Sequence, residues 1–134
     1  MKIVLIENDV ALLRTLEIFL KSLGNQVRAF DDPTDACSFL EKYADLDILI
    51  LDYMMPEFTA PEVLQRVKRH IPDGPKVILI SGHTDIIESL DLKEMGVDVF
   101  LAKPLDLDLL FEMLHPEELD PARRLPNGGL ASET

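Results

Sequence analysis

The sequence contains a single cysteine, Cys37, among 134 residues. One cysteine can form neither an intrachain disulfide nor a cysteine-based zinc site, and it favours a reducing compartment. Long apolar runs are also missing, since no stretch reaches the roughly 20 residues of a membrane-spanning helix. The apolar run at residues 1–6 is too short for a signal peptide. We therefore expect a cytoplasmic protein without a membrane segment.

Basic residues are scarce in this chain. It has 13 lysines and arginines against 25 aspartates and glutamates, a formal net charge of −12. Phosphate contacts need clustered basic side chains, so this balance argues against nucleic acid as a direct partner. It fits a protein that binds cations or basic surfaces. Apolar residues make up 47% of the chain, which is enough for the core of one domain of ordinary size.

Five short apolar runs alternate with amphipathic stretches. The predicted strands are 3–6, 26–30, 48–51, 77–80 and 99–101, and the predicted helices are 10–23, 33–43, 61–71, 85–95 and 107–114. Continuously apolar strands are typical of a parallel sheet that is buried on both faces. The alternation predicts an α/β fold of (βα)5 type with an open, doubly wound, five-stranded parallel sheet. The expected strand order is 2-1-3-4-5, the flavodoxin-like arrangement.

Helical spacing also predicts which side chains are buried. The expected stripes are Leu12, Leu16, Phe19 and Leu23 in the first helix, and Ala36, Phe39, Leu40 and Tyr43 in the second. We expect the domain to cover residues 1–116. Residues 117–134 contain two prolines and an Asn-Gly-Gly stretch with little helical periodicity, so we interpret them as a tail or linker stub.

Polar side chains follow four of the five predicted strands. They are Glu7, Asn8 and Asp9 after the first strand, Asp52 after the third, Ser81 after the fourth and Lys103 after the fifth. Sites in open α/β sheets form outside the carboxyl ends of the strands. The four strands concerned are neighbours in the predicted order, so we expect these side chains to meet at one edge of the sheet.

The residue types at this edge favour phosphoryl chemistry. Carboxylates that lie close together either raise a pKa or bind a cation, and a donor set made only of oxygen suits Mg²⁺. Asp52, with a cation on one side and Lys103 and Ser81 beside it, is arranged to attack phosphorus as a nucleophile. An acyl phosphate adds charge and acceptor oxygens, which can move a loop.

Four motifs carry a resemblance to a known family. They are Leu5-Ile6-Glu7-Asn8-Asp9, Leu49-Ile50-Leu51-Asp52-Tyr53-Met54-Met55-Pro56, Ile78-Leu79-Ile80-Ser81-Gly82 and Phe100-Leu101-Ala102-Lys103-Pro104. With these motifs in this order, residues 1–115 resemble the response-regulator receiver domain. Each motif alone is weak, whereas four motifs in order on one predicted edge are specific.

The resemblance implies a phosphorylation-dependent switch rather than an enzyme with a turnover substrate. Asp52 would accept a phosphoryl group from a histidine kinase or a histidine phosphotransfer protein, and Ser81 and Lys103 would bind that group. Phe100 would act as an aromatic switch, and the Lys103–Pro104 bond would be cis. The implied Mg²⁺ ligands are Glu7, Asn8, Asp9, Asp52 and the backbone carbonyl of Met54.

The resemblance also implies an output surface. A downstream protein would bind the face formed by residues 85–95, 99–101 and 107–114, and the apolar side chains of Leu105, Leu107 and Leu109 could support a homodimer. His83, two residues after Ser81, could lie at the mouth of the site and affect the access of water. The cognate kinase and the pathway are not encoded in these patterns.

Two positions depart from the family pattern. Asn8 stands where the family usually has a second acid that binds the metal directly, so we expect weaker Mg²⁺ binding than in a receiver with an acid there. Ala60 replaces a glycine that is usual in the loop after Asp52, which is tolerable where φ is negative. The first departure motivates an alternative hypothesis, a receiver-like interaction module that no longer depends on phosphorylation.

Two further classes fit less well. A phosphohydrolase of the haloacid dehalogenase type needs a second aspartate two residues after the nucleophile, and Met54 stands there. A flavodoxin would bind a phosphate after the first strand, where Glu7 and Asp9 would repel it. A shared fold alone does not imply a shared function.

Overall fold

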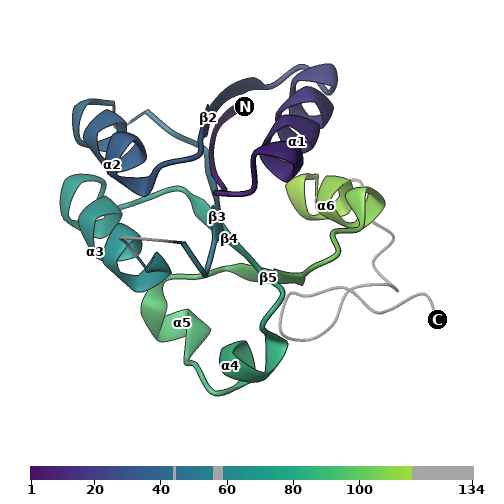
Figure 1. The fold of residues 1–134 in the computed structure, drawn as a ribbon. Coiled ribbons are helices and arrows are strands. Elements are labelled where there is room, and N and C mark those ends of the chain that lie inside the picture. Colours follow the sequence, from purple (N-terminus) through teal and green to yellow (C-terminus); the bar gives the residue numbers. More distant parts are fainter. Residues whose placement is uncertain (44, 56–58, 116–134) are drawn as a thin grey trace. The chain divides into compact units, whose positions relative to one another are not determined.

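The computed structural model describes residues 1–43, 45–55 and 59–115. The chain divides into two compact units, Met1–Ala102 and Lys103–Thr134. The strands, all in the first unit, are β1 (Lys2–Ile6), β2 (Gln26–Phe30), β3 (Ile48–Asp52), β4 (Lys76–Ser81) and β5 (Val99–Ala102). The helices of this unit are α1 (Val10–Ser22), α2 (Pro33–Lys42), α3 (Ala60–His70), α4 (Thr84–Glu88) and α5 (Leu92–Met95) (Figure 1). The second unit contains α6 (Leu107–Leu114).

The five strands form one parallel sheet in the order β2-β1-β3-β4-β5. This confirms the predicted fold class and strand order. The register aligns Ile6 with Leu51 and Asp52 with Ile80. The carboxyl ends of β1, β3 and β4 therefore lie at one edge of the sheet, in neighbouring positions.

Helices cover both faces of the sheet in the first unit. Figure 1 shows α1 on one face and α2 and α3 on the other. The second face is packed by a continuous cluster of buried side chains from β1, β3 and β4 and from α2 and α3. All five residues of β3 are buried, as expected for the central strand of a sheet with helices on both sides. Cys37 is part of this cluster and is buried.

The helix starts follow from local sequence. Asp32 accepts a hydrogen bond from the backbone N–H of Thr34, and Pro33 occupies the first turn of α2, a typical start of a helix. After α1 the chain reverses at Gly24, whose φ of 89° lies in the left-handed region that glycine adopts without strain.

The helix predicted over residues 85–95 is wrong in one respect, because the structure divides it into α4 and α5. Asp91 lies between them and accepts a hydrogen bond from the backbone N–H of Glu94. This aspartate followed by a glutamate three residues later is a helix-start signature. The cap begins a new helix where the apolar spacing alone predicts a continuous one.

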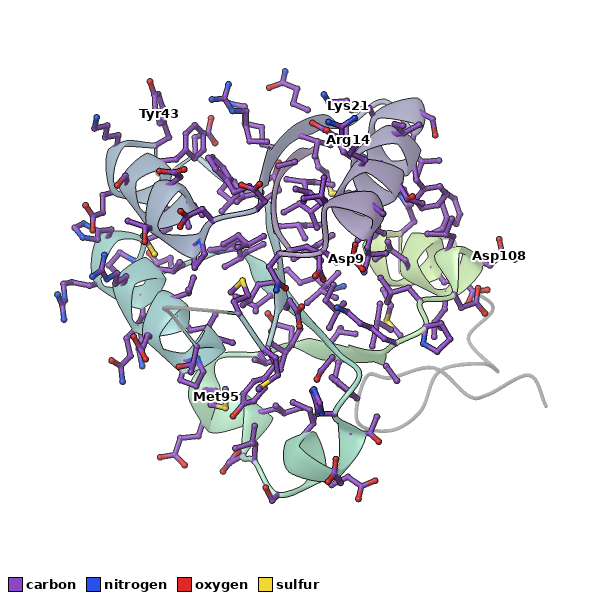
Figure 2. All side chains as sticks on the ribbon, in the orientation of Figure 1. Asp9, Arg14, Lys21, Tyr43, Met95 and Asp108 are labelled. Carbon is purple, nitrogen blue, oxygen red and sulfur yellow. The ribbon has the colours of Figure 1, made fainter. Side chains whose placement is uncertain are left out.

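The sets of buried residues predicted for the first two helices are also partly wrong. On α1 the buried residues are Leu13, Leu16 and Leu20, whereas Leu12, Phe19 and Leu23 are only half-buried. Tyr43, predicted to be buried, follows α2 and is 58% exposed. Figure 2 shows its side chain directed outward from this end of α2.

The second unit starts at Lys103. The Lys103–Pro104 peptide bond is cis, as the resemblance implies. Asp106 caps α6 by accepting hydrogen bonds from the backbone N–H groups of Asp108 and Leu109. The predicted tail over residues 117–134 lies outside the described residues. Within the described ranges, no helix has the length and apolar character needed to cross a membrane.

Candidate functional site

Buried polar side chains mark one place in the first unit. Among the described residues, the buried polar or charged side chains are Glu7, Asp52 and Ser81, with exposed fractions of 0%, 4% and 0%. Asp52 and Ser81 end β3 and β4, and Glu7 directly follows β1. Charged groups are rarely buried unless they are paired or have a function. Their position at the carboxyl edge of the sheet agrees with the site predicted from the sequence.

Local turns hold these three side chains in place. In each case the side chain accepts a hydrogen bond from the backbone N–H group two residues later. The donor–acceptor pairs are Asp9 N to Glu7 Oε1 (2.9 Å), Met54 N to Asp52 Oδ1 (3.2 Å) and His83 N to Ser81 Oγ (3.0 Å). Aspartate and serine side chains commonly close such turns. The backbone therefore orients all three groups at the strand ends.

Asn8 connects the two carboxylates. Its side-chain amide lies beside Glu7 Oε1 and Asp52 Oδ2, which are both acceptors, so we assign the amide nitrogen to this side. In this orientation the nitrogen donates to the two oxygens at 3.2 Å and 3.3 Å. One amide nitrogen thus lies within hydrogen-bond distance of both carboxylates. This contact brings Glu7, Asn8 and Asp52 together at the edge of the sheet, as the sequence predicts.

Asp9 has a different role in the structure. Its Oδ1 atom accepts hydrogen bonds from the backbone N–H groups of Ala11 and Leu12, at 3.1 Å and 3.3 Å. Asp9 is the N-cap of α1 and lies at the start of this helix (Figure 2). A carboxylate at a helix N-terminus is favourable for both hydrogen bonding and the helix dipole. Its predicted role as a metal ligand stays a prediction.

The residues that converge here fit Mg²⁺. Two carboxylates and a carboxamide supply only oxygen ligands, and Mg²⁺ needs one or two protein carboxylates because it keeps several of its waters. Within the described ranges, no cluster of three or more histidine, cysteine, aspartate or glutamate side chains has the arrangement to hold a metal. The candidate oxygen ligands that the structure brings together are therefore the carboxylates of Glu7 and Asp52 and the side-chain amide of Asn8.

Ser81 is positioned for a second function beyond closing its turn. It ends β4, the strand next to β3, and is paired in register with Ala102. A hydroxyl that accepts one hydrogen bond can still donate its own proton. Ser81 can therefore donate to an anionic oxygen at this edge while the His83 N–H group holds it in place.

Residues 3–115 of the chain match the family model described as "Response regulator receiver domain". The chain belongs to this family. Among curated proteins, the receiver is 29% identical over 115 residues to the cell cycle transcriptional regulator CtrA of Caulobacter vibrioides. It is 30% identical over 115 residues to the cell cycle response regulator CtrA of Brucella ovis. Each alignment covers 86% of this chain and 49% of the relative, so the chain spans about half the length of these curated relatives.

Solved structures show the same fold. A CheY-like receiver domain protein from Methanospirillum hungatei aligns with a TM-score of 0.78 at 20% identity, over 87% of this chain and 91% of that chain. The chemotaxis response regulator CheY4 of Vibrio cholerae aligns with a TM-score of 0.77 at 20% identity, over 86% of this chain and 96% of that chain. These similarities support the five-stranded α/β architecture of the receiver.

The remaining predicted site residues of the receiver occupy different parts of the chain. Phe100 lies in β5, in register with Leu79, and is partly buried against the core. Lys103 belongs to the second unit, so its role beside Asp52 stays a prediction. Ala60 is the first residue of α3 and is fully buried, and the helix explains why alanine is accepted there. His83 is exposed and contributes its backbone N–H group to the turn of Ser81.

Two contacts of the receiver site were not predicted from the sequence. The N–H group of Met54 donates to Asp52, and the predicted metal contact of its backbone carbonyl stays a prediction. An aspartate at the end of a strand commonly closes a turn through the N–H group two residues later, and this signal could have identified the contact. The bridging amide of Asn8 has no comparable signal, because it depends on the spacing between β1 and β3.

Proposed function

We propose that this receiver is a phosphorylation-dependent signalling switch whose phosphoryl acceptor is Asp52. The phosphoryl donor would be a phosphohistidine on a histidine kinase or a histidine phosphotransfer protein. Family membership supports the switch function in general terms. The observation that carries the assignment to Asp52 is that the buried polar side chains among the described residues gather at its end of the sheet.

The proposed step is a transfer between two nucleophiles. A carboxylate oxygen of Asp52 attacks the phosphorus atom, a P–O bond forms, and the P–N bond to the imidazole breaks. The imidazole nitrogen leaves with the bonding electron pair, and the ring leaves as neutral imidazole because its other nitrogen carries a proton. The turn formed with the Met54 N–H group fixes Asp52 Oδ1, which keeps the carboxylate oriented for attack.

Ser81 and Lys103 would bind the transferred group. The Ser81 hydroxyl donates to a phosphoryl oxygen while it accepts from His83, and the ammonium of Lys103 adds a positive charge. Mg²⁺ held by Glu7, Asn8 and Asp52 would neutralise the charge of the phosphoryl oxygens; Asp9 and the Met54 carbonyl are the further candidate ligands. A phosphoryl group adds charge and acceptor oxygens, so movement of Ser81 toward it would leave space for Phe100 to turn inward.

The bounds of the receiver domain and its protein partners are further proposals. We propose that the receiver domain comprises residues 1–116 and that downstream proteins bind a surface that includes α4, α5, β5 and α6. Leu105 and Leu109 are candidates for a homodimer contact. The chain would act as a switch without a turnover substrate and would need neither nucleic acid nor a membrane as a direct partner.

A small phosphodonor tests the assignment to Asp52. Acetyl phosphate and MgCl₂ are added to the purified chain, and the intact mass is measured over time. We expect one phosphoryl adduct on the wild type and none on Asp52→Asn. Asp35→Asn is the matched control, because it makes the same change at an exposed residue in the first turn of α2 and should give the wild-type adduct. An absent adduct on the wild type, or an undiminished adduct on Asp52→Asn, would remove the proposal.

The alternative is a receiver-like interaction module that works without phosphate. One observation supports it: the amide of Asn8 already bridges Glu7 and Asp52, so the site holds together by hydrogen bonds within the chain. The same experiment separates the two functions, since a folded wild type that takes up no phosphoryl group at saturating MgCl₂ favours the module.

A further inference from the structure

Asn8 is exposed, whereas the two carboxylates beside it, Glu7 and Asp52, are buried. Its side-chain amide faces Glu7 Oε1 and Asp52 Oδ2, and with the nitrogen assigned to the side of these two acceptors the distances are 3.2 Å and 3.3 Å. We propose that Asn8 is a positioning residue that holds the two carboxylates together in the absence of a metal and must turn its amide to admit Mg²⁺. This inference rests on the proposed function, because the cation matters to the chain only if Asp52 accepts a phosphoryl group.

The electrostatic argument starts from the two carboxylates. Like charges this close repel each other, and the repulsion is relieved by a cation or by hydrogen-bond donors. A primary amide carries two N–H donors on one nitrogen, so Asn8 can donate one hydrogen to Glu7 and the other to Asp52. The amide thus supplies, without a net charge, part of the stabilisation that a bound cation would provide.

The same contact opposes the cation. Mg²⁺ binds oxygen, whereas the nitrogen of the amide faces the two carboxylates. Presenting the oxygen requires a half-turn of the amide and the loss of both hydrogen bonds. Because Asn8 is exposed, this turn needs no repacking of buried side chains. We therefore expect the site to be stable without a metal and to bind Mg²⁺ weakly for two reasons. The amide of Asn8 must turn before its oxygen can bind, and position 8 lacks the negative charge of an acid.

Substitution of Asn8 tests this inference by stability and metal affinity, without any phosphodonor. Thermal denaturation is measured in EDTA and across a MgCl₂ titration for the wild type, Asn8→Asp and Asn8→Ala. Asn8→Asp should melt at a lower temperature than the wild type in EDTA, and its Kd for Mg²⁺ should fall on the order of tenfold, because a donor is replaced by a third charged ligand. Asn8→Ala should also lose stability in EDTA, but its affinity for Mg²⁺ should not increase.

Gln65→Glu is the matched control for the added charge. It makes the same amide-to-carboxylate change at an exposed position of α3 and should leave both the EDTA melting temperature and the Mg²⁺ affinity unchanged. Wild-type stability for Asn8→Ala in EDTA would overturn the inference. Unchanged Mg²⁺ affinity in Asn8→Asp would also overturn it.

A spectroscopic measurement on the wild type does not depend on any variant folding. In a ¹⁵N-labelled sample without metal, the side-chain NH₂ signals of Asn8 should exchange slowly with water and should shift on addition of MgCl₂. Signals that do not respond to MgCl₂ would contradict the proposed turn of the amide. Failure of the proposed function would look different: the MgCl₂ and stability results would hold, but no phosphoryl adduct would form on Asp52.

Discussion

Ser81 offers a test that separates the function of its hydroxyl from the stability of its turn. In Ser81→Ala the hydrogen bond from the His83 N–H group to Oγ is lost. His83 is exposed, so water can replace the acceptor, and the free energy of unfolding should fall by only about 0.5–1 kcal/mol. The effect on phosphorylation should be larger. A hydrogen bond to a charged group contributes about 1.5–3 kcal/mol, which corresponds to about 10- to 150-fold in rate.

Ser81→Thr should give the opposite result. Threonine keeps the hydroxyl but adds a methyl group at a fully buried position, where overpacking typically costs about 1–3 kcal/mol. The assay is the initial rate of phosphorylation by acetyl phosphate at saturating MgCl₂, together with urea denaturation of each variant. We expect Ser81→Ala to be the slower acceptor and Ser81→Thr the less stable protein. If Ser81→Ala accepts phosphate at the wild-type rate, the hydroxyl only closes its turn and the reasoning fails.

Two further predictions concern stability. Asp91→Ala removes the cap of α5 and should lower the free energy of unfolding by about 1 kcal/mol, measured by urea denaturation, whereas Asp91→Asn keeps a capping oxygen and should stay near the wild type; equal stability of all three would argue against the cap. Burial raises the pKa of the Cys37 thiol above its usual 9.0, with Arg66 opposing and Glu41 adding to the shift. Because the pKa is raised in the folded state, the preference of the folded protein for the neutral Cys37 thiol contributes to stability in full below pH 9.0. This contribution is lost as the pH rises through the folded-state pKa. Stability should therefore decline less steeply above pH 9.0 in Cys37→Ala than in the wild type, and identical slopes would contradict the assignment.

The fold could be predicted from the sequence wherever the pattern of apolar and polar residues allows only one interpretation. β1 and β3 contain continuous apolar runs, residues 3–6 and 48–51, that are bounded by polar residues, so their position and burial follow directly. The buried face of α1 could not be predicted in the same way. Apolar residues occur on several faces of this helix, and Ile18 is 70% exposed. Only packing against the sheet selects Leu13 and Leu20 over their apolar neighbours.

The division between α4 and α5 was missed for a related reason. Spacing of apolar residues reports which face of a helix is buried, but it does not report where the backbone changes direction. The change of direction depends on a polar signal, the hydrogen bond between Asp91 and the Glu94 N–H group. A search for capping residues inside a long predicted helix would have found it.

The location of the site could be predicted because parallel strands bring their carboxyl ends to one edge. Its internal contacts could not, because they depend on distances of a few tenths of an ångström between side chains of different strands. Asn8 illustrates the limit. The sequence predicts an amide oxygen that binds a metal, which stays a prediction. The two acceptors beside the amide, Glu7 and Asp52, assign its nitrogen to that side when no cation is bound.

Burial of Glu7 and Asp52 indicates which part of the receiver would change most on phosphorylation. Buried carboxylates are unfavourable unless donors surround them, and backbone N–H groups of Asp9 and Met54 supply part of that stabilisation. A phosphoryl group on Asp52 would replace one negative charge by about two and would compete for the same donors. These donors belong to the loops after β1 and β3, whereas the hydrogen bonds of the sheet are not involved. The energetic change on phosphorylation should therefore be largest in these loops, and hydrogen exchange should change there before it changes in β1 or β3.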